Sequence, residues 1–229
     1  MEEKRNLKSP LGSLKISEEE DYGKISTNGS VKATVPFTVE QLAINGSLKG
    51  IKLTILEKGQ INGGVIVEEA IDGADTAKLI INGSCNTPLL ENFDKLVING
   101  KILTKLILGI KKLRIAGVFE DIEEIEAENV RIDLAGECKI GTIKKAVNVE
   151  IGKPKEKSGT INLNIGGKNV VKNIHANFSD KEAFAEIDEI HATGTVELDH
   201  VKVNKVYAKE LFVGEETEIG EFIEIVDDE

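Results

Sequence analysis

Three consecutive segments of this chain, each 17 residues long, repeat one pattern of residue types: residues 79–95, 96–112 and 113–129. Each opens with an apolar residue, any residue, a second apolar residue, any residue and then glycine. A residue of a type that is commonly buried, Cys85, Ile102 or Phe119, follows two positions after that glycine. A fixed period of this length indicates a stacked architecture that grows by adding turns, and it argues against a globular core.

The same frame extends towards both ends of the chain. Steps of 17 residues separate the four glycines that precede residue 79, and the next step is 20 because residues 71–77 form a polar insert. After residue 129, two residues are inserted before the next glycine, and the pattern returns near residue 194. The predicted corner glycines are Gly12, Gly29, Gly46, Gly63, Gly83, Gly100, Gly117, Gly136 and Gly194.

Each column of the repeat has a physical meaning. Apolar residues spaced by one belong to one face of a strand, where side chains alternate with period two. Asparagine precedes five of the glycines, and both residues tolerate left-handed backbone angles, so Asn-Gly predicts a corner once per repeat. A second inward column is expected two residues past the glycines, at Leu14, Val31, Leu48, Val65, Cys85, Ile102 and Phe119.

The predicted fold class is therefore all-β. Three short strands and three bends in 17 residues make one coil of a parallel β-helix, whose coils stack at about 4.8 Å. Roughly thirteen coils predict a rod on the order of 60 Å long. Right-handed crossovers are the general preference for parallel strands.

The expected domain organisation is a short tail over residues 1–7 and a single solenoid domain over residues 8–229. An interruption is expected at about residues 153–189, beginning with a charged loop at residues 152–159. Ser179, Asp180, Lys181 and Glu182 form a possible capping box, which predicts a short helix over residues 183–188.

Composition excludes several partners. The net charge of −11 argues against phosphate-driven binding of nucleic acid and against docking on an anionic membrane surface. The N-terminus lacks an apolar stretch of signal-peptide length, and no window of about 18 apolar residues occurs. We therefore expect a soluble, cytoplasmic protein without direct membrane insertion.

Few residues are candidates for chemistry. Cys85 and Cys138 lie three predicted coils apart, about 14 Å, whereas a disulfide requires Cα atoms within about 7 Å. Both are expected to be buried free thiols. His191 and His200 lie near Asp199, but their spacing matches no familiar metal-ligand pattern, and a solvated surface histidine is expected.

The remaining polar motifs also favour a structural interpretation. The acidic residues between Glu120 and Glu128 alternate with Ile122, Ile125 and Ala127, as expected for the solvated face of a coil. No glycine stands in a phosphate-binding loop motif. We therefore expect no catalytic residue, no metal, no cofactor and no enzymatic activity.

Residues 96–112, 122–143 and 190–203 resemble the core of bactofilins, bacterial cytoskeletal proteins that form polymers. The resemblance implies a right-handed triangular β-helix that joins end to end into nonpolar filaments without nucleotide and serves as a cytoplasmic scaffold. Here the repeat fills nearly the whole chain, which begins with acidic residues, so membrane attachment is not carried over. The interruption at residues 153–189 is also foreign to that family's pattern.

Two other functions are considered. A left-handed β-helix acyltransferase needs an apolar residue every six, about 18 per coil, and a period of 17 leaves that register. A monomeric or dimeric solenoid that binds carbohydrate or protein predicts a ladder of exposed aromatic residues, yet the Phe and Tyr residues do not share a column.

The C-terminal coil is the predicted surface for self-association. Apolar residues run to within three residues of the last position, so little polar cover is expected over the open end of the stack. A second copy of the chain is the expected partner, joined tail to tail in a dimer or tail to head in a filament. The predicted contact residues are Leu211, Val213, Phe222, Ile223, Ile225 and Val226.

Overall fold

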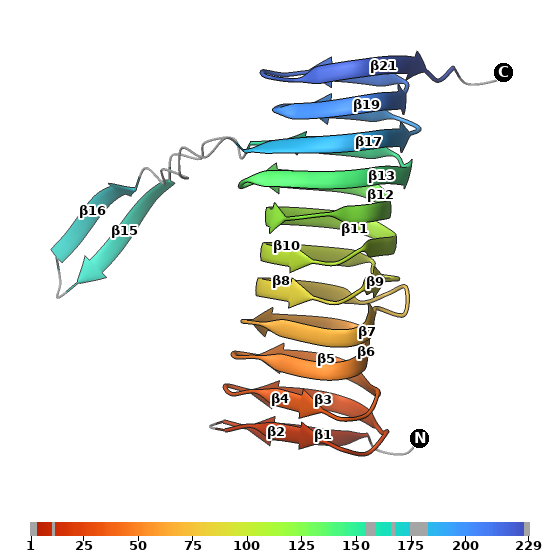
Figure 1. Ribbon diagram of the computed structural model, residues 1–229. Coiled ribbons are helices and arrows are strands. Elements are labelled where there is room, and N and C mark those ends of the chain that lie inside the picture. Colours follow the sequence, from red (N-terminus) through yellow and green to blue (C-terminus); the bar gives the residue numbers. More distant parts are fainter. Residues whose placement is uncertain (1–3, 11, 154–158, 166–167, 175–182, 227–229) are drawn as a thin grey trace.

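A computed structural model describes residues 4–10, 12–153, 159–165, 168–174 and 183–226 of the chain. These residues form a parallel β-solenoid of about 11 turns, with the coils stacked one upon the next (Figure 1). The predicted fold class is confirmed. The turns are fewer than the thirteen expected, and the described residues of the interruption, 159–165 and 168–174, form a separate hairpin instead of a coil.

Each coil has three faces, which the middle of the chain illustrates. Residues 95–99 lie on the first face, residues 101–103 on the second and residues 106–108 on the third. Several strands run across a corner from one face to the next. The strands of the lower half are β1 (Arg5–Ser9), β2 (Leu14–Ile16), β3 (Asp21–Thr27), β4 (Val31–Ala33), β5 (Phe37–Ile44), β6 (Leu48–Asn62), β7 (Val65–Asp72), β8 (Lys78–Asn86), β9 (Leu89–Glu91) and β10 (Lys95–Leu103).

The upper half continues the same parallel sheet. Its strands are β11 (Leu106–Phe119), β12 (Ile122–Leu134), β13 (Glu137–Ala146), β14 (Asn148–Gly152), β17 (Phe184–Ala192), β18 (Thr195–Leu198), β19 (Val201–Ala208), β20 (Glu210–Val213) and β21 (Glu218–Glu224).

The core consists of stacked apolar columns. Strand register joins Leu14, Val31, Leu48, Val65, Cys85, Ile102 and Phe119 in one continuous column, as the repeat predicts. On the first face, Ile61, Ile81, Ile98, Ile115, Ile132 and Ile151 form another, and each is at most 1% exposed. β-branched residues suit these positions because they pack well against identical neighbours on a pleated sheet.

The corner glycines are required by the distance between coils. A Cβ added at Gly63 would overlap the carbonyl oxygen of Gly46, and the same is true of Gly29, Gly46, Gly83, Gly100 and Gly117 on the glycine below each. This glycine stack begins at Gly12. Gly136 and Gly194 lie at bends but stand outside it, since their nearest neighbours are Val118 and Val147.

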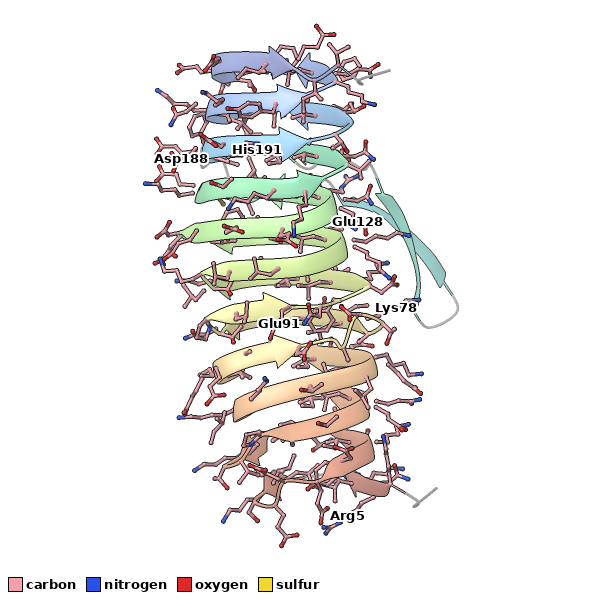
Figure 2. The ribbon with its side chains drawn as sticks, turned by 90° about the vertical axis from the view of Figure 1, so that its right-hand side faces the viewer. Arg5, Lys78, Glu91, Glu128, Asp188 and His191 are labelled. Atoms are coloured by element: carbon pink, nitrogen blue, oxygen red, sulfur yellow. The ribbon has the colours of Figure 1, made fainter. Side chains whose placement is uncertain are left out.

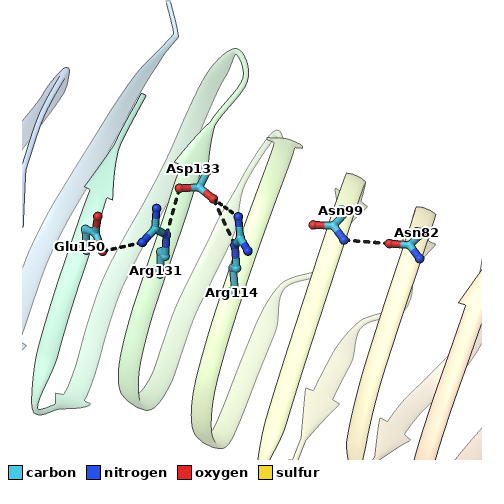
Figure 3. A network of polar contacts seen from close by, with 6 residues as sticks. All are labelled: Asn82, Asn99, Arg114, Arg131, Asp133 and Glu150. Carbon is cyan, nitrogen blue, oxygen red and sulfur yellow. Dashed lines mark hydrogen bonds and ion pairs between the residues drawn. The ribbon is translucent and has the colours of Figure 1, made fainter. Parts of the chain in front are cut away.

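The asparagines that precede these glycines form a ladder. Each side-chain amide donates a hydrogen bond to the side-chain oxygen of the asparagine one coil below, at 2.7–2.9 Å. Figure 3 shows its last step, from Asn99 to Asn82. The members of this asparagine ladder are Asn28, Asn45, Asn62, Asn82 and Asn99.

The predicted short helix is wrong. Residues 184–188 belong to β17, which pairs in parallel with β13 below and β19 above. Ala185 and Ile187 are buried while Glu186 and Asp188 are exposed, so the alternation of a strand decides the structure here. The possible capping box at residues 179–182 lies outside the described residues.

Two further observations concern the boundaries of the solenoid. β1 begins at Arg5 and pairs with β3, so part of the expected N-terminal tail already belongs to the first coil. Within the interruption, β15 (Gly159–Ile165) and β16 (Lys168–Ile174) form an antiparallel hairpin that makes its own two-stranded sheet.

Candidate functional site: the open ends of the solenoid

The last coil has an unpaired upper edge in the part of the chain that the structure describes. β20 pairs with β18, and β21 pairs with β19; neither has a described strand on its other side (Figure 1, dark blue). Such an edge presents free backbone donors and acceptors to any strand that can approach it.

Two side chains of this coil point into the core columns but remain uncovered. Val213 continues the column of Leu198, which is 2% exposed, yet Val213 itself is 54% exposed. Phe222 continues the column of Val206, which is 0% exposed, yet Phe222 is 42% exposed. These exposures arise because no described coil covers the two side chains from above.

The other four predicted contact residues differ in orientation and exposure. Leu211 stacks on Val196 and is half-buried, so it belongs to the interior of the coil. Ile223 pairs with Tyr207, which lies on the outer side of the third face, so Ile223 points outward. Ile225 is half-buried beyond the end of β21, and Val226 is 77% exposed.

The last coil is strongly acidic. Residues 209–226 contain six glutamates and one lysine, a formal charge of −5. Two of the glutamates are paired with the coil below, Glu218 with Lys202 at 3.2 Å and Glu221 with Lys205 at 2.9 Å.

The first coil differs in charge from the last. Residues 4–21, a stretch of equal length, contain four cations (Lys4, Arg5, Lys8 and Lys15) and four carboxylates (Glu18, Glu19, Glu20 and Asp21), a formal charge of zero. Its strands β1 and β2 pair with β3 and β4, and no described strand lies below them. Leu7 and Leu14 are half-buried there, so this end also offers apolar surface, without the excess of negative charge of the last coil.

Both cysteines are free and buried, in agreement with the sequence analysis. Burial raises the pKa of Cys85 to about 12 and the pKa of Cys138 to about 11. The thiolate is the reactive form of cysteine, so these side chains act as small apolar residues in the core.

The histidines lie in two different environments. His191 is half-exposed and stacks on Tyr207 with ring centroids 4.3 Å apart, consistent with the expected surface position. His200 instead is buried, with a side chain 9% exposed. His175 lies outside the described residues.

His200 stands at a corner with a positive φ of 57°, and its backbone N–H donates to the carbonyl of Glu215 in the coil above. Its Nδ1 lies 3.0 Å from a carboxylate oxygen of Asp199, and its Nε2 lies 3.6 Å from Glu216. Among the described residues, no group of three His, Cys, Asp or Glu side chains is placed to hold a metal ion.

The acidic run between residues 120 and 128 lies on the surface, and most of its carboxylates pair with lysines of adjacent coils. Lys105 binds Asp121 at 2.6 Å, and its hydrogen bond holds the pKa of this carboxyl below its ordinary value. Lys144 binds Glu124 at 2.6 Å, and Lys145 binds Glu126 at 2.9 Å. These carboxylates form ion pairs between coils.

One polar network was not anticipated from the sequence. Asp133, 8% exposed, occupies the position two coils above Asn99 and accepts hydrogen bonds from Arg114 and Arg131 (Figure 3). Arg131 also donates to Glu150 at 3.1 Å. Because Arg114 and Arg131 are neighbours in one column, the buried carboxylate separates two like charges.

The comparisons with known proteins identify no relative, since no protein-family model, curated protein or solved structure matches the chain. Within the described ranges, no helix is long and apolar enough to span a membrane.

Proposed function

We propose that this protein is a non-enzymatic scaffold whose solenoids associate through their ends. The observation that carries the proposal is the exposure of Val213 and Phe222, which occupy core columns but have no covering coil among the described residues. Solenoids ordinarily cover such an end with a polar cap to remain soluble. A second copy of the chain supplies the same cover by continuing the stack.

Charge and register favour head-to-tail contact. If the columns continue by one coil, Leu7 of a second copy lies over Leu211, and Lys15 lies beside Glu218. Two last coils, each with a charge of −5, would instead repel each other in a tail-to-tail dimer. A head-to-tail contact does not close on itself, so it extends into a filament.

The resemblance to bactofilins supports the same class of function, a polymer-forming cytoskeletal scaffold in the cytoplasm. The proposed polarity differs from the nonpolar filaments of that family, because the two ends of this solenoid differ in charge. Head-to-tail assembly requires neither a nucleotide nor another cofactor, since stacking buries apolar surface that is already exposed.

The test replaces both uncovered core residues by lysine in a Val213→Lys/Phe222→Lys variant. A matched control, Phe212→Lys/Ile223→Lys, adds the same two charges to the same coil at positions that point outward. Sedimentation velocity and negative-stain electron microscopy are expected to show filaments for the unmodified protein and for the control, but monomers for the first variant. Circular dichroism checks that each variant is folded.

The decisive measurement is the unmodified chain at high concentration and high salt, where screening weakens repulsion between acidic molecules. If it sediments as a monomer there, end-to-end association is rejected. The alternative is then a monomeric solenoid that binds protein or carbohydrate along its length.

A further inference from the structure

One outer column of the first face is occupied by lysines in consecutive coils. Strand register places Lys58, Lys78, Lys95 and Lys112 directly above one another, and Lys24 lies two coils below Lys58, across Gln41. We call these five residues the lysine ladder. All five are exposed, and Figure 2 marks Lys78 on the outer surface of the solenoid.

The lysine ladder lacks intramolecular partners in the described structure. Eight other lysines, among them Lys101, Lys105 and Lys144, form ion pairs, but no ladder lysine does. The acidic residues directly beside Lys58 and Lys95 in sequence are engaged elsewhere: Glu57 accepts a hydrogen bond from Gln41, and Asp94 pairs with Lys111. Like charges stacked directly opposite each other are unfavourable, which an acidic partner would relieve.

Two other columns run parallel to the lysine ladder on the same face. The next outward column holds Ile80, which is 37% exposed, and Val97 in the coil above it. Beyond it lies the asparagine ladder; the amide of Asn82 donates one hydrogen bond and accepts one within the ladder, which leaves one N–H and one lone pair for another partner. The central coils thus repeat a cation, an apolar side chain and an amide, as in Lys78, Ile80 and Asn82.

The face is hollowed at the upper end of the lysine ladder. A groove of about 390 Å³ is lined by Lys112, Asn129, Arg131, Asn148 and Glu150, among others. Asn148 donates to Asn129 at 3.1 Å, so the amide pattern recurs in the groove. The lysine ladder therefore leads, at its upper end, into this groove.

We propose that this face binds an extended acidic peptide segment of a partner protein, laid parallel to the solenoid axis. Its carboxylates would pair with the lysine ladder, its apolar side chains would cover Ile80 and Val97, and its backbone would bond to the asparagine amides. The distance from Lys24 to Lys112 is five coil steps, about 24 Å, which an extended strand of about seven residues spans. The face lacks aromatic side chains on which nucleic acid bases stack, so a nucleic acid fits it less well.

This inference does not depend on end-to-end association, because the lysine ladder lies on the flank of the solenoid. The probe is a labelled peptide of about eight residues that alternates Glu and Val, and its neutral counterpart carries Gln in place of Glu. Fluorescence anisotropy with the full chain is expected to show binding of the acidic peptide, weakening as salt rises, and no binding of the neutral one.

The test variant is Lys78→Ser/Lys95→Ser. The matched control, Lys32→Ser/Lys49→Ser, removes two stacked, exposed lysines of the second face, which lie beside serines instead of the apolar and asparagine columns. Loss of two exposed ion pairs is expected to raise the dissociation constant about tenfold for the test variant. The control is expected to change it by less than about twofold.

Three results would overturn the inference. The acidic peptide could fail to bind, or both double variants could weaken it equally, which would indicate attraction to any surface lysine. A single-stranded DNA of equal charge could bind as tightly as the peptide, which would assign the face to polyanions in general.

Discussion

The two cysteines illustrate how burial controls the chemistry of a single residue. With a pKa of about 12 for Cys85 and about 11 for Cys138, few thiolates exist near pH 8. We expect both thiols of the native protein to react with a disulfide reagent at least about 100-fold more slowly than free cysteine. Reaction in guanidinium is expected to reveal two thiols. A Ser47→Cys variant provides an exposed control, and fast reaction of the native unmodified chain would contradict the assigned burial.

Gly63 and Gly64 are adjacent corner glycines, but only Gly63 is packed against the backbone of the coil below. Gly63 has a φ of 150° and belongs to the glycine stack, so Gly63→Ala introduces both backbone strain and overlap with the carbonyl of Gly46. We expect a loss of about 2–4 kcal/mol in the free energy of unfolding, measured by denaturant titration. At Gly64 an added Cβ meets only the flexible side chain of Ser84, at 3.3 Å. Equal losses for Gly63→Ala and Gly64→Ala would show that close stacking is not the cause.

Polar networks act at the scale of the strands they join. Asp133→Ala leaves Arg114 and Arg131 stacked without the carboxylate that separates them. Both guanidinium groups are half-exposed, with side chains 52% and 42% exposed, so solvent screens part of their repulsion. We expect a loss of about 2 kcal/mol in the free energy of unfolding, smaller at high salt.

Glu137→Ala is the matched control for this network, because it removes an exposed carboxylate from the next strand, β13. Its unfolding free energy is expected to change by less than about 0.5 kcal/mol. A similar loss in both variants would mean that the effect of Asp133 is only a change in net charge.

Strands with the regular period could be predicted from sequence because the same residue types recur at each position. The inward column from Leu14 to Phe119 is confirmed coil by coil. The capping pattern before β17 predicts a helix, whereas the partners of this strand, β13 and β19, are distant from it in sequence. Pairing with such partners outweighs local propensity.

The sequence predicts that the last coil forms the candidate site, but it does not predict the orientation of each side chain in that coil. After the interruption the frame is offset, so the outward position of Ile223 follows only from its register with Tyr207. The buried position of His200, at a corner with a positive φ and beside Glu216 of the coil above, is not specified by the sequence pattern. The network around Asp133 needs three strands in register, which one repeat cannot reveal.

At the scale of the whole molecule, the interruption is separable from the stack. β15 and β16 pair with each other and with no other described strand. Deletion of residues 154–182 would leave Ile151 and Ala185 five positions apart. At other corners between the first and second faces, the two inward residues that flank the corner are four apart, as for Ile98 and Ile102, or six apart, as for Ile132 and Cys138. A spacing of five lies between these two values.

We therefore expect the deleted chain to keep its β-solenoid, with an unfolding free energy within about 1 kcal/mol of the intact chain. Circular dichroism and denaturant titration provide the measurement, and deletion of residues 122–143, which removes stacked strands, provides the destabilising control. Loss of the folded state on removal of residues 154–182 would show that the interruption supports the stack.

The glycine stack has a further consequence for how such a molecule can change its size. Because each corner touches only the coil above and the coil below, a gene segment encoding one 17-residue unit can be duplicated or lost while every remaining contact is preserved. Each event changes the length by about 4.8 Å. The number of repeat units therefore determines the length of the solenoid, while its cross-section stays constant.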